Sequence, residues 1–461
     1  MKTLFVCTVL AAGLSRAVLV AAASPVRVIP LVFKSRTLAN GLRFLSLEDH
    51  SSPMVAVQVW YKVGAKDDPA GRSGFAHLFE HMMFKGTRNM KPEMMDRLTE
   101  DVGGYNNAST GDDFTHYYEE IPSNYLQTLL WAEAERLSSL QVNQANFSSE
   151  RDVVKEEFRQ RILAPPYGRF GYLIEQKSFS VHPYKRPTIG SMEELDAASL
   201  EDVRAFHRNF YRADNAVLVV AGDFDQKRLD EWVDKYFSAI RRPPEPIPRV
   251  TVKEPPRAGE RRYTEFGENV PLPAVAFTYL VARAADDDAA ALRVAQSVLS
   301  EGESSRLYQA LVYERQIAQE AFSSADLRQD AGLFVLGAIV AGGKSPAEVQ
   351  SALAAELDRM KNEPVGQAEL EKAKNQLVTG ELRGRQTCTG KADLLGEATV
   401  MYGDPERANS EIDRLQSVTA ADVRRVMKQY FPESNRVVLE YFPESMRRQS
   451  KQGRDERGQT R

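Results

Sequence analysis

Two stretches in the first half of the chain alternate their side chains in the manner of β-strands. Met54 to Trp60 is one, and Ala216 to Val220, with its β-branched valines, is the other. Between them, apolar residues recur at helical spacing over Leu126 to Leu140 and Glu150 to Ile162. Strands at both ends with long helices between them predict an α+β domain.

The same pattern occurs again 220 positions further on. Two stretches, about 150 residues apart, agree on this single offset, which predicts two homologous domains. Pro53, Val55, Ala56, Ala65, Asp67 and Asp68 fall on Pro273, Val275, Ala276, Ala285, Asp287 and Asp288, and Asp202, Val203, Arg204 and Asn215 fall on Asp422, Val423, Arg424 and Asn435. Ser199 and Thr419 precede the matched helix in the two halves and are expected to be its N-caps.

We divide the chain into five segments. They are an export signal at 1–23, a first α+β domain at 24–241, a linker at 242–258, a second domain at 259–443 and a tail at 444–461. A run of prolines from Pro243 to Pro248 marks the linker. The charged tail lacks periodicity and is predicted to be disordered.

The N-terminus has the composition of an export signal. Lys2 precedes an apolar stretch from Leu4 to Leu14, and three alanines precede Ser24. Export predicts a protein of the bacterial periplasm. The first acidic residue is Glu48, and an acid-poor leader also suits import into the mitochondrial matrix, although the scarcity of serine favours secretion.

Composition narrows the choice of partners. The 461 residues carry a formal net charge of −4, which argues against nucleic acid as a binding partner.

No segment after the leader is long and apolar enough to cross a bilayer. Cys7 lies in the leader, so Cys388 remains alone, forms no internal disulfide and is expected to be inert packing or a surface thiol.

The most informative motif is His77-Leu78-Phe79-Glu80-His81. On a helix, positions i, i+3 and i+4 share a face, so His77, Glu80 and His81 project together from an otherwise apolar segment. A lone core histidine is usually just hydrogen-bonded, but here two coincide with a glutamate in a chain of six histidines. The spacing H-x-x-E-H is a zinc-peptidase signature. We therefore expect one zinc ion per chain.

A third ligand is expected from the helix that contains Glu150 and Glu157. With Val153 and Val154, these two glutamates form one stripe along the helix. Carboxylates on an apolar face suit a metal ligand, Glu157, and a supporting group, Glu150. The spacing also fits a solvated acidic stripe, so both interpretations remain open from the residues alone.

Together these motifs resemble the insulinase/pitrilysin family of zinc peptidases. His77-x-x-Glu80-His81 is followed, 76 positions after His81, by Glu157 in Glu150-Arg-Asp-Val-Val-x-x-Glu157. The resemblance covers almost all of the mature chain and is strongest to the branch that includes mitochondrial and bacterial processing peptidases. It implies that each half is a mostly antiparallel sheet packed with helices, and that two such halves or subunits surround a closed chamber that admits peptides.

The resemblance also implies roles for single residues. His77, His81 and Glu157 would bind zinc, Glu80 would be the general base, and Glu150 would steady the site. Substrate in that family adds as an extra strand near an Asn-Ala pair, here Asn107 and Ala108. The polar run 106–110 suits an exposed edge open to an added strand, and a plain glycine turn leading into a hairpin is the less favoured alternative.

One departure from the family pattern concerns the second half. The family commonly supplies an arginine there and a tyrosine seven positions on, but the matching positions hold Val312 and Gln319. Neither side chain can stabilise an oxyanion as arginine and tyrosine do. We therefore predict a heterodimer with a homologous subunit that carries the pair. A homodimer, and a substitute role for Tyr313 or Arg315, remain open.

The leading hypothesis is an exported zinc endopeptidase that cleaves unfolded peptides. The alternatives are a non-catalytic structural or assembly subunit and a module that binds peptides without cutting them. The second half has no metal motif, because His77, Glu80 and His81 fall on Ser297, Ser300 and Glu301 at the shift of 220. The remaining histidines lack metal-like spacing: His116 is expected in a strand, and His50, His182 and His207 in loops or surface helices.

Overall fold

The computed structural model describes residues 26–447. Residues 31–447 belong to one compact unit. The predicted export signal at 1–23 and most of the predicted tail lie outside the described residues, and the described tail residues, 444–447, form a helical turn. No helix within 26–447 is long and apolar enough to cross a membrane.

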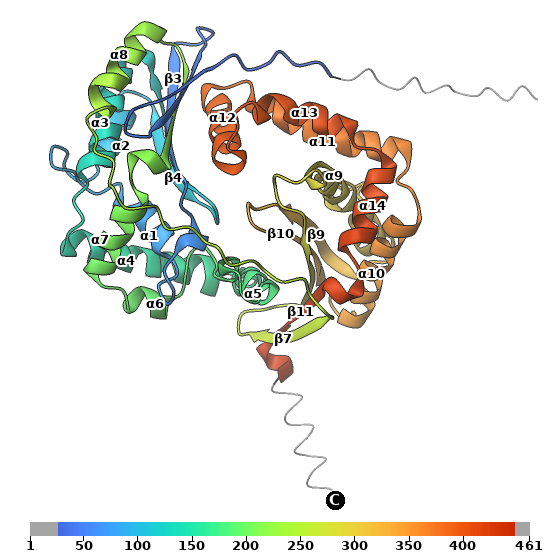
Figure 1. Ribbon diagram of the computed structural model, residues 1–461. Helices are drawn as coiled ribbons and strands as arrows, with labels where there is room; N and C mark the ends of the chain where they lie inside the picture. The colour runs from blue at the N-terminus through green and yellow to red at the C-terminus, as the bar shows by residue number, and fades with distance from the viewer. Residues whose placement is uncertain (1–25, 448–461) are drawn as a thin grey trace, which may run out of the picture. The chain divides into compact units, whose positions relative to one another are not determined.

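The first half contains a six-stranded sheet in the order β1-β2-β6-β3-β5-β4 (Figure 1). Neighbouring strands are antiparallel except β2 and β6. The strands are β1 Lys34–Thr37, β2 Arg43–Glu48, β3 Met54–Tyr61, β4 Tyr105–Thr110, β5 Thr115–Pro122 and β6 Ala216–Gly222. The two strands predicted from the sequence are therefore β3 and β6, which lie side by side in the sheet.

The second half repeats this design in a five-stranded sheet, β7-β11-β8-β10-β9, in which only β7 and β11 are parallel. Its strands are β7 Arg261–Gly267, β8 Ala274–Val281, β9 Ala318–Asp326, β10 Gly332–Val340 and β11 Arg436–Pro443. Two mostly antiparallel sheets, each packed with helices, confirm the predicted α+β class.

The helices follow the predicted repeat. Those of the first half are α1 Phe75–Met82, α2 Met94–Glu100, α3 Leu126–Ser139, α4 Gln144–Phe158, α5 Gly168–Ser178, α6 Met192–Asp196, α7 Leu200–Phe210 and α8 Gln226–Phe237. Those of the second are α9 Ala289–Ser300, α10 Pro346–Asn362, α11 Gln367–Gly384, α12 Cys388–Tyr402, α13 Arg407–Ser417 and α14 Ala420–Tyr430. The pairs α3 and α10, α5 and α12, and α7 and α14 each begin 220 positions apart, as the self-comparison predicts.

The predicted N-caps of α7 and α14 are confirmed. Ser199 accepts the backbone N–H of Asp202 through its hydroxyl, and the Asp202 carboxylate accepts the N–H of Ser199 in return. Thr419 and Asp422 make the same reciprocal pair of bonds. Two equivalent helices thus begin on the same capping box, which satisfies N–H groups that the first helical turn leaves unpaired.

Each half lends one helix to the sheet of the other (Figure 1). Helix α12 packs on one face of the first sheet, where Cys388, Ala392 and Leu395 meet apolar side chains of β3 and β6, including Ala56, Trp60, Val217 and Val219. Helix α5 packs on the second sheet, where Phe170, Leu173 and Ile174 meet Ala274, Ala276, Leu439 and Tyr441. The opposite face of the first sheet carries α1, α3, α7 and α8. This exchange joins the halves through apolar contacts. The segment that links them along the chain, residues 238–260, contains no helix or strand.

A glycine makes the close approach of α12 possible. A Cβ atom at Gly396 would lie 2.2 Å from Nε1 of Trp60. That indole donates to Oε1 of Gln58 at 2.9 Å, and the Gln58 amide donates to Asp393 of α12 at 2.8 Å. The helix therefore sits against a fixed, buried indole with no room for a side chain.

We predict that Gly396→Ala destabilises the protein by about 1–3 kcal/mol, because the added methyl group overpacks against Trp60. Gly380→Ala is the matched control, since Gly380 also lies in a helix but has no atom within 4 Å of its Cβ position. That change should stabilise by roughly 0.5–1 kcal/mol through helix propensity. Denaturant unfolding of both variants gives the comparison, and equal stability of the two would contradict the close packing of α12.

Candidate active site

Helix α1 carries the H-x-x-E-H motif, and its first turn is held by a buried carboxylate. Asp68 accepts the N–H groups of Gly74 at 2.7 Å and Ala76 at 2.8 Å. Gly74 has φ +90°, and a Cβ there would lie 2.9 Å from the carbonyl oxygen of Ile189, so only glycine fits this start. Burial raises the pKa of Asp68 to about 7, although these N–H groups oppose the rise.

The predicted helix buries most of its length. Phe75, Ala76, His77, Leu78, Phe79 and Met82 are buried, whereas Glu80 and His81 are half-buried. His77 is 8% exposed, and the apolar residues belong to the core of the first half. The apolar positions therefore anchor α1, and its ionisable face lies at the edge of that core.

The structure brings His77, His81 and Glu157 together. Oε2 of Glu157 lies 3.6 Å from Nε2 of His77 and 3.3 Å from Nε2 of His81. One donor atom from each residue lies within 4.8 Å of the other two. Ligands about 2.0–2.2 Å from a tetrahedral zinc ion lie roughly 3.3–3.6 Å apart, so the two distances from Glu157 to the histidines match those around such an ion.

The protonation states of these groups also suit a metal. Burial, and then the neighbouring His81, lower the pKa of His77 to about 4. A hydrogen bond with His81 lowers the pKa of Glu157 despite its partial burial. Metal ligands must be unprotonated, and at neutral pH His77 is neutral while Glu157 is ionised.

Glu80 lies on the same face of α1 and has its own partner. The hydroxyl of Thr110, at the end of β4, donates to Oε2 of Glu80 at 2.5 Å. Burial raises the pKa of Glu80, and the bond from Thr110 opposes that rise. The carboxyl group thus keeps one oxygen engaged and the other available beside the candidate metal ligands.

Glu150, predicted as a supporting group, lies between Lys85 and His81. It is 4% exposed, and its carboxylate lies 3.0 Å from Nζ of Lys85 and 3.8 Å from Nδ1 of His81. The predicted stripe is wrong in one respect, because Val153 is 45% exposed and Val154 alone of the two valines is buried. Helix α4 begins at Gln144 rather than Glu150, because Asn143 caps it by accepting the N–H of Asn146.

Sequence reasoning missed four residues of this site: Asp68, Lys85, Thr110 and Arg161. Nη1 of Arg161 lies 2.7 Å from Oε1 of Glu157 and holds the carboxylate oxygen that faces away from the histidines. Arg161 sits on a π-helical turn, Arg159–Leu163, that follows α4. Lys85 and Arg161 each come one helical turn after a predicted ligand, a spacing that could have identified them. No local signal marks Asp68 or Thr110.

The predicted substrate pair lies on β4, the last described strand at its edge of the sheet. Asn107 is exposed, and its Oδ1 accepts the N–H of Ala108 at 2.8 Å. The Ala108 side chain is buried in the core, so the main chain of this residue is what a peptide could contact. Gly103, at φ +85°, does form a turn, and that turn leads into the edge strand.

The positions that replace the family's arginine and tyrosine are not part of this cluster. Val312 is half-buried on the π-helical segment Tyr308–Glu314, and Gln319 is exposed on β9. Tyr313 is 67% exposed, and Arg315 lies 3.7 Å from Glu348 of its own half. None of these four side chains has a described contact with the three candidate ligands.

The helix of the second half that matches α1 makes a neutral hydrogen bond at the position of His77. Ser297 of α9 stands where His77 stands in α1, and its hydroxyl donates to Oε1 of Gln376 on α11 at 3.3 Å. Helices α9 and α11 correspond to α1 and α4.

Three residues outside the motif can be compared with expectation, and one of them differs. His182 was expected in a loop or surface helix, but it is fully buried, because it packs against Tyr184 and lies 3.6 Å from Asp330. Cys388 is 7% exposed, which favours the packing role over a surface thiol. His116 lies in β5, as predicted.

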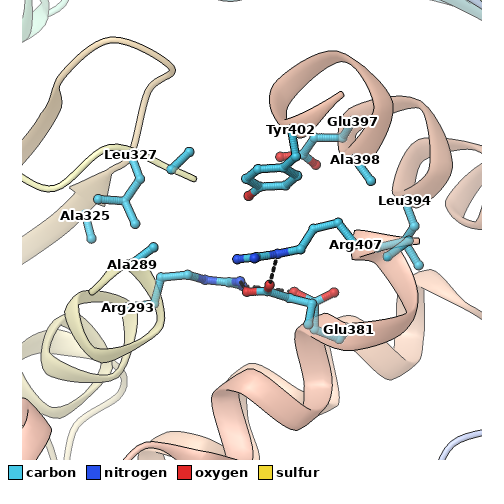
Figure 2. Close-up of a pocket in the computed structure, with 13 residues that line it drawn as sticks. Ala289, Arg293, Ala325, Leu327, Glu381, Leu394, Glu397, Ala398, Tyr402 and Arg407 are labelled. Carbon is cyan, nitrogen blue, oxygen red and sulfur yellow. Dashed lines mark hydrogen bonds and ion pairs between the residues drawn. The ribbon is translucent and has the colours of Figure 1, made fainter. Parts of the chain in front are cut away.

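A separate cavity of about 290 Å³ lies in the second half, between α9, α11, α12 and α13 (Figure 2). Its arginines are already paired: Arg293 lies 3.0 Å from Glu381 and 2.7 Å from Glu411, and Arg407 also pairs with Glu411. None of its lining residues belongs to the metal cluster. The cavity is therefore lined by a self-contained ion network rather than by groups that await a ligand.

Two α+β halves, with an inverted zinc-peptidase motif in the first alone, define a class of metallopeptidase, and comparison with known proteins identifies it. The family model described as Insulinase (Peptidase family M16) matches residues 43–190, and that described as Peptidase M16 inactive domain matches 197–377. The zinc protease PqqE of Helicobacter pylori is 31% identical over 406 residues, which cover 87% of this chain and 90% of that protein. The chain belongs to the insulinase family.

Solved structures agree with this assignment. The crystal structure of a protease from Helicobacter pylori matches with a TM-score of 0.86 at 30% identity, over 90% of this chain and 100% of that chain. The periplasmic protease PqqL from Escherichia coli shares the fold with a TM-score of 0.72 at 18% identity, over 89% of this chain but 47% of that chain.

We expect Glu157→Gln to weaken zinc binding roughly 100-fold or more, because loss of a direct ligand should cost at least as much as loss of its outer supports. Glu156→Gln is the matched control, since Glu156 is the exposed neighbour on α4 and bonds only to Arg159 and Gln160. Competition with a chromogenic chelator measures both affinities. Equal zinc affinity in the two variants would remove Glu157 from the ligand set.

Proposed function

We propose that the chain is a zinc-dependent endopeptidase that cleaves unfolded peptides. The observation that carries this proposal is the meeting of His77, His81 and Glu157 within 4.8 Å, with Glu80 on the same helical face. Family membership supports it, and the relative PqqE is named a zinc protease.

In this proposal each side chain of the site has a separate role. His77, His81 and Glu157 hold the ion, which when bound supplies a Lewis acid that polarises the scissile carbonyl and activates water. Glu80 accepts the proton of the attacking water and passes it to the leaving amine. Thr110 holds the Glu80 carboxylate in place.

The supporting groups orient the ligands. Glu150 lies near the outer nitrogen of His81 and is itself held by Lys85, and Arg161 holds the far oxygen of Glu157. Such outer partners fix the ring orientation of a ligating histidine and the pose of a ligating carboxylate. Glu150 is therefore proposed as a positioning residue rather than a group that touches substrate.

The edge of β4 is the proposed place for substrate. A peptide strand can add to an unpaired sheet edge through main-chain hydrogen bonds, which requires an extended and therefore unfolded segment. The Asn107 side chain accepts the N–H of Ala108. That hydrogen bond must break, and the side chain must move away, before a peptide can accept the same N–H. Asn107 would thus exchange an internal bond for one to the substrate.

Three further features support a two-chain periplasmic enzyme. Val312 has no hydrogen-bond donor, and the neutral amide of Gln319 cannot stabilise an oxyanion as arginine and tyrosine do, so a homologous subunit would bring that pair. The fold match to PqqL covers about half of that chain, so a protein of twice this length contains such a unit as one part. The composition of the leader supports export.

A non-catalytic subunit is the second candidate. The family model described as an inactive domain favours it, but that model matches residues 197–377. All the candidate ligands, together with Glu80 and Glu150, fall within the other match, 43–190. The inactive-domain match therefore concerns the part of the chain without the metal cluster.

We expect Glu80→Gln to retain zinc and to lower kcat by about 10²–10⁴-fold, the usual contribution of a general base. Glu156→Gln again serves as the control and should keep full activity. Cleavage of a quenched fluorescent peptide, measured beside the zinc content of each variant, separates loss of chemistry from loss of metal. Full activity of Glu80→Gln would overturn the role of Glu80.

The partner proposal has its own test. The chain alone should cleave the peptide slowly, and addition of a homologous subunit with the arginine–tyrosine pair should raise kcat by roughly 10²–10³-fold, the effect of an added oxyanion donor. A chelator should abolish the gain. Undiminished cleavage by the lone chain would remove the two-subunit arrangement while leaving the peptidase assignment intact.

A further inference from the structure

The turn between β9 and β10 of the second half reaches into the first half. Arg328 on this turn, 327–331, is 3% exposed, and its Nε lies 3.1 Å from Oδ2 of Asp112. Its guanidinium carbon lies 5.5 Å and 4.9 Å from the ring centres of Phe179 and Tyr184. A buried arginine of one half is thus enclosed by a carboxylate and two aromatic rings of the other.

The next two residues of the turn make a second set of bonds. The N–H of Gln329 donates to Oδ2 of Asp113 at 3.0 Å, and the N–H of Asp330 donates to the hydroxyl of Tyr184 at 3.1 Å. Nζ of Lys66 lies 2.8 Å from Asp113 and 2.9 Å from Asp330. The Tyr184 hydroxyl donates to Asp113 at 2.5 Å. Three consecutive residues of the second half therefore engage one buried polar cluster of the first.

What this cluster holds is the turn between β4 and β5. Asp112 and Asp113 both lie on that turn, two and three positions after Thr110. The same turn is tied at Gly111, whose N–H donates to Phe114 and whose carbonyl accepts the N–H of Ala65. Thr110 ends β4 and donates to Glu80, so the braced turn leads directly to the candidate base.

Burial restricts the charged groups of this cluster to positions in which each has its partner. A buried charge is costly unless its partners are in place, so Arg328, Asp113 and Lys66 are stable in one arrangement of the two turns. Arg328 also pairs with Asp326 of its own half and lies 3.8 Å from Glu175 of α5. The cluster therefore fixes a position rather than merely adding contact area.

We propose that Arg328, Gln329 and Asp330 are positioning residues for Glu80. They hold the β4–β5 turn, the turn holds Thr110, and Thr110 holds the carboxylate. The second half, which has no metal cluster of its own within the described residues, thereby takes part in the chemistry of the first. This inference rests on the proposed peptidase function and adds to it a role for the half matched by the inactive-domain model.

The test is a double-mutant cycle in the full chain, assayed with its partner subunit if the enzyme needs one. Arg328→Gln should lower kcat about 10- to 100-fold with KM changed less than about threefold, because a misplaced base slows chemistry without weakening binding. Thr110→Val should lower kcat similarly. If both act through one path, the double variant loses no more than the worse single variant.

Arg283→Gln is the matched control. Arg283 also belongs to the second half and also pairs with an aspartate, Asp286, but the pair is exposed and lies within one half. Its variant should keep the wild-type kcat. Equal kcat in the Arg283→Gln and Arg328→Gln variants, or losses that multiply in the double variant, would overturn the proposal.

A milder substitution, Asp330→Asn, and a second measurement, hydrogen exchange, keep the proposal testable if Arg328→Gln does not fold or the chain shows no activity. If Arg328→Gln fails to fold, Asp330→Asn takes its place in the cycle, because it keeps the side-chain shape and removes the charge that pairs with Lys66. Hydrogen exchange over residues 105–115 should quicken in either variant while zinc content stays constant. If the zinc-loaded wild type does not cleave peptides, the proposed function fails, and exchange alone then decides: unchanged exchange would also overturn the bracing.

Discussion

Two imidazoles within an apolar helix impose a constraint that the surrounding structure has to meet. Buried ionisable groups need partners or a metal, and α1 offers His77 and His81 from a surface that is otherwise core. The fold supplies partners to these groups. Glu157 of α4 lies beside the two histidines, Thr110 of β4 bonds to Glu80, and Glu150, paired with Lys85, lies behind the ring of His81. These partners come from α4, from β4 and from the segment that follows α1, so the site exists only when the first half is assembled.

The duplication explains how the rest of the chain came to serve this site. Both halves use the same order of strands and the same capped helix, and each lends a helix to the sheet of the other. At the shift of 220, His77 falls on Ser297 and Glu157 on Leu377, and Ser297 bonds to Gln376 beside that leucine. Its β9–β10 turn contributes Arg328 to a buried cluster beside the β4–β5 turn.

Much of this could be predicted from local sequence. Two of these predictions rest on local patterns, namely the helical phase of His77, Glu80 and His81 and the alternation of strand β3. The repeat at a shift of 220 positions comes from comparing the chain with itself. The structure agrees with all three. Glu157 required the family resemblance, because spacing alone allowed a solvated stripe. Val153 shows the limit of such spacing, since a stripe on a helical wheel is wider than the face that neighbouring helices cover.

The residues that sequence reasoning missed depend on contacts distant in sequence. Thr110 reaches Glu80 across 30 positions, and Arg328 reaches Asp112 across more than 200, so no periodicity reveals either pair. The bond between Asn107 and Ala108 was missed for a different reason, because a side chain that satisfies its neighbour's N–H leaves no pattern in the sequence. His182 illustrates the same point, since a loop position gave no sign of complete burial.

Anomalous X-ray scattering at the zinc absorption edge, recorded from crystals of the zinc-loaded chain, tests the central claim most directly. A single anomalous peak should lie about 2.0–2.2 Å from Nε2 of His77, Nε2 of His81 and a carboxylate oxygen of Glu157. A folded, zinc-loaded chain whose anomalous peak lies elsewhere, or whose three side chains point apart, would contradict it.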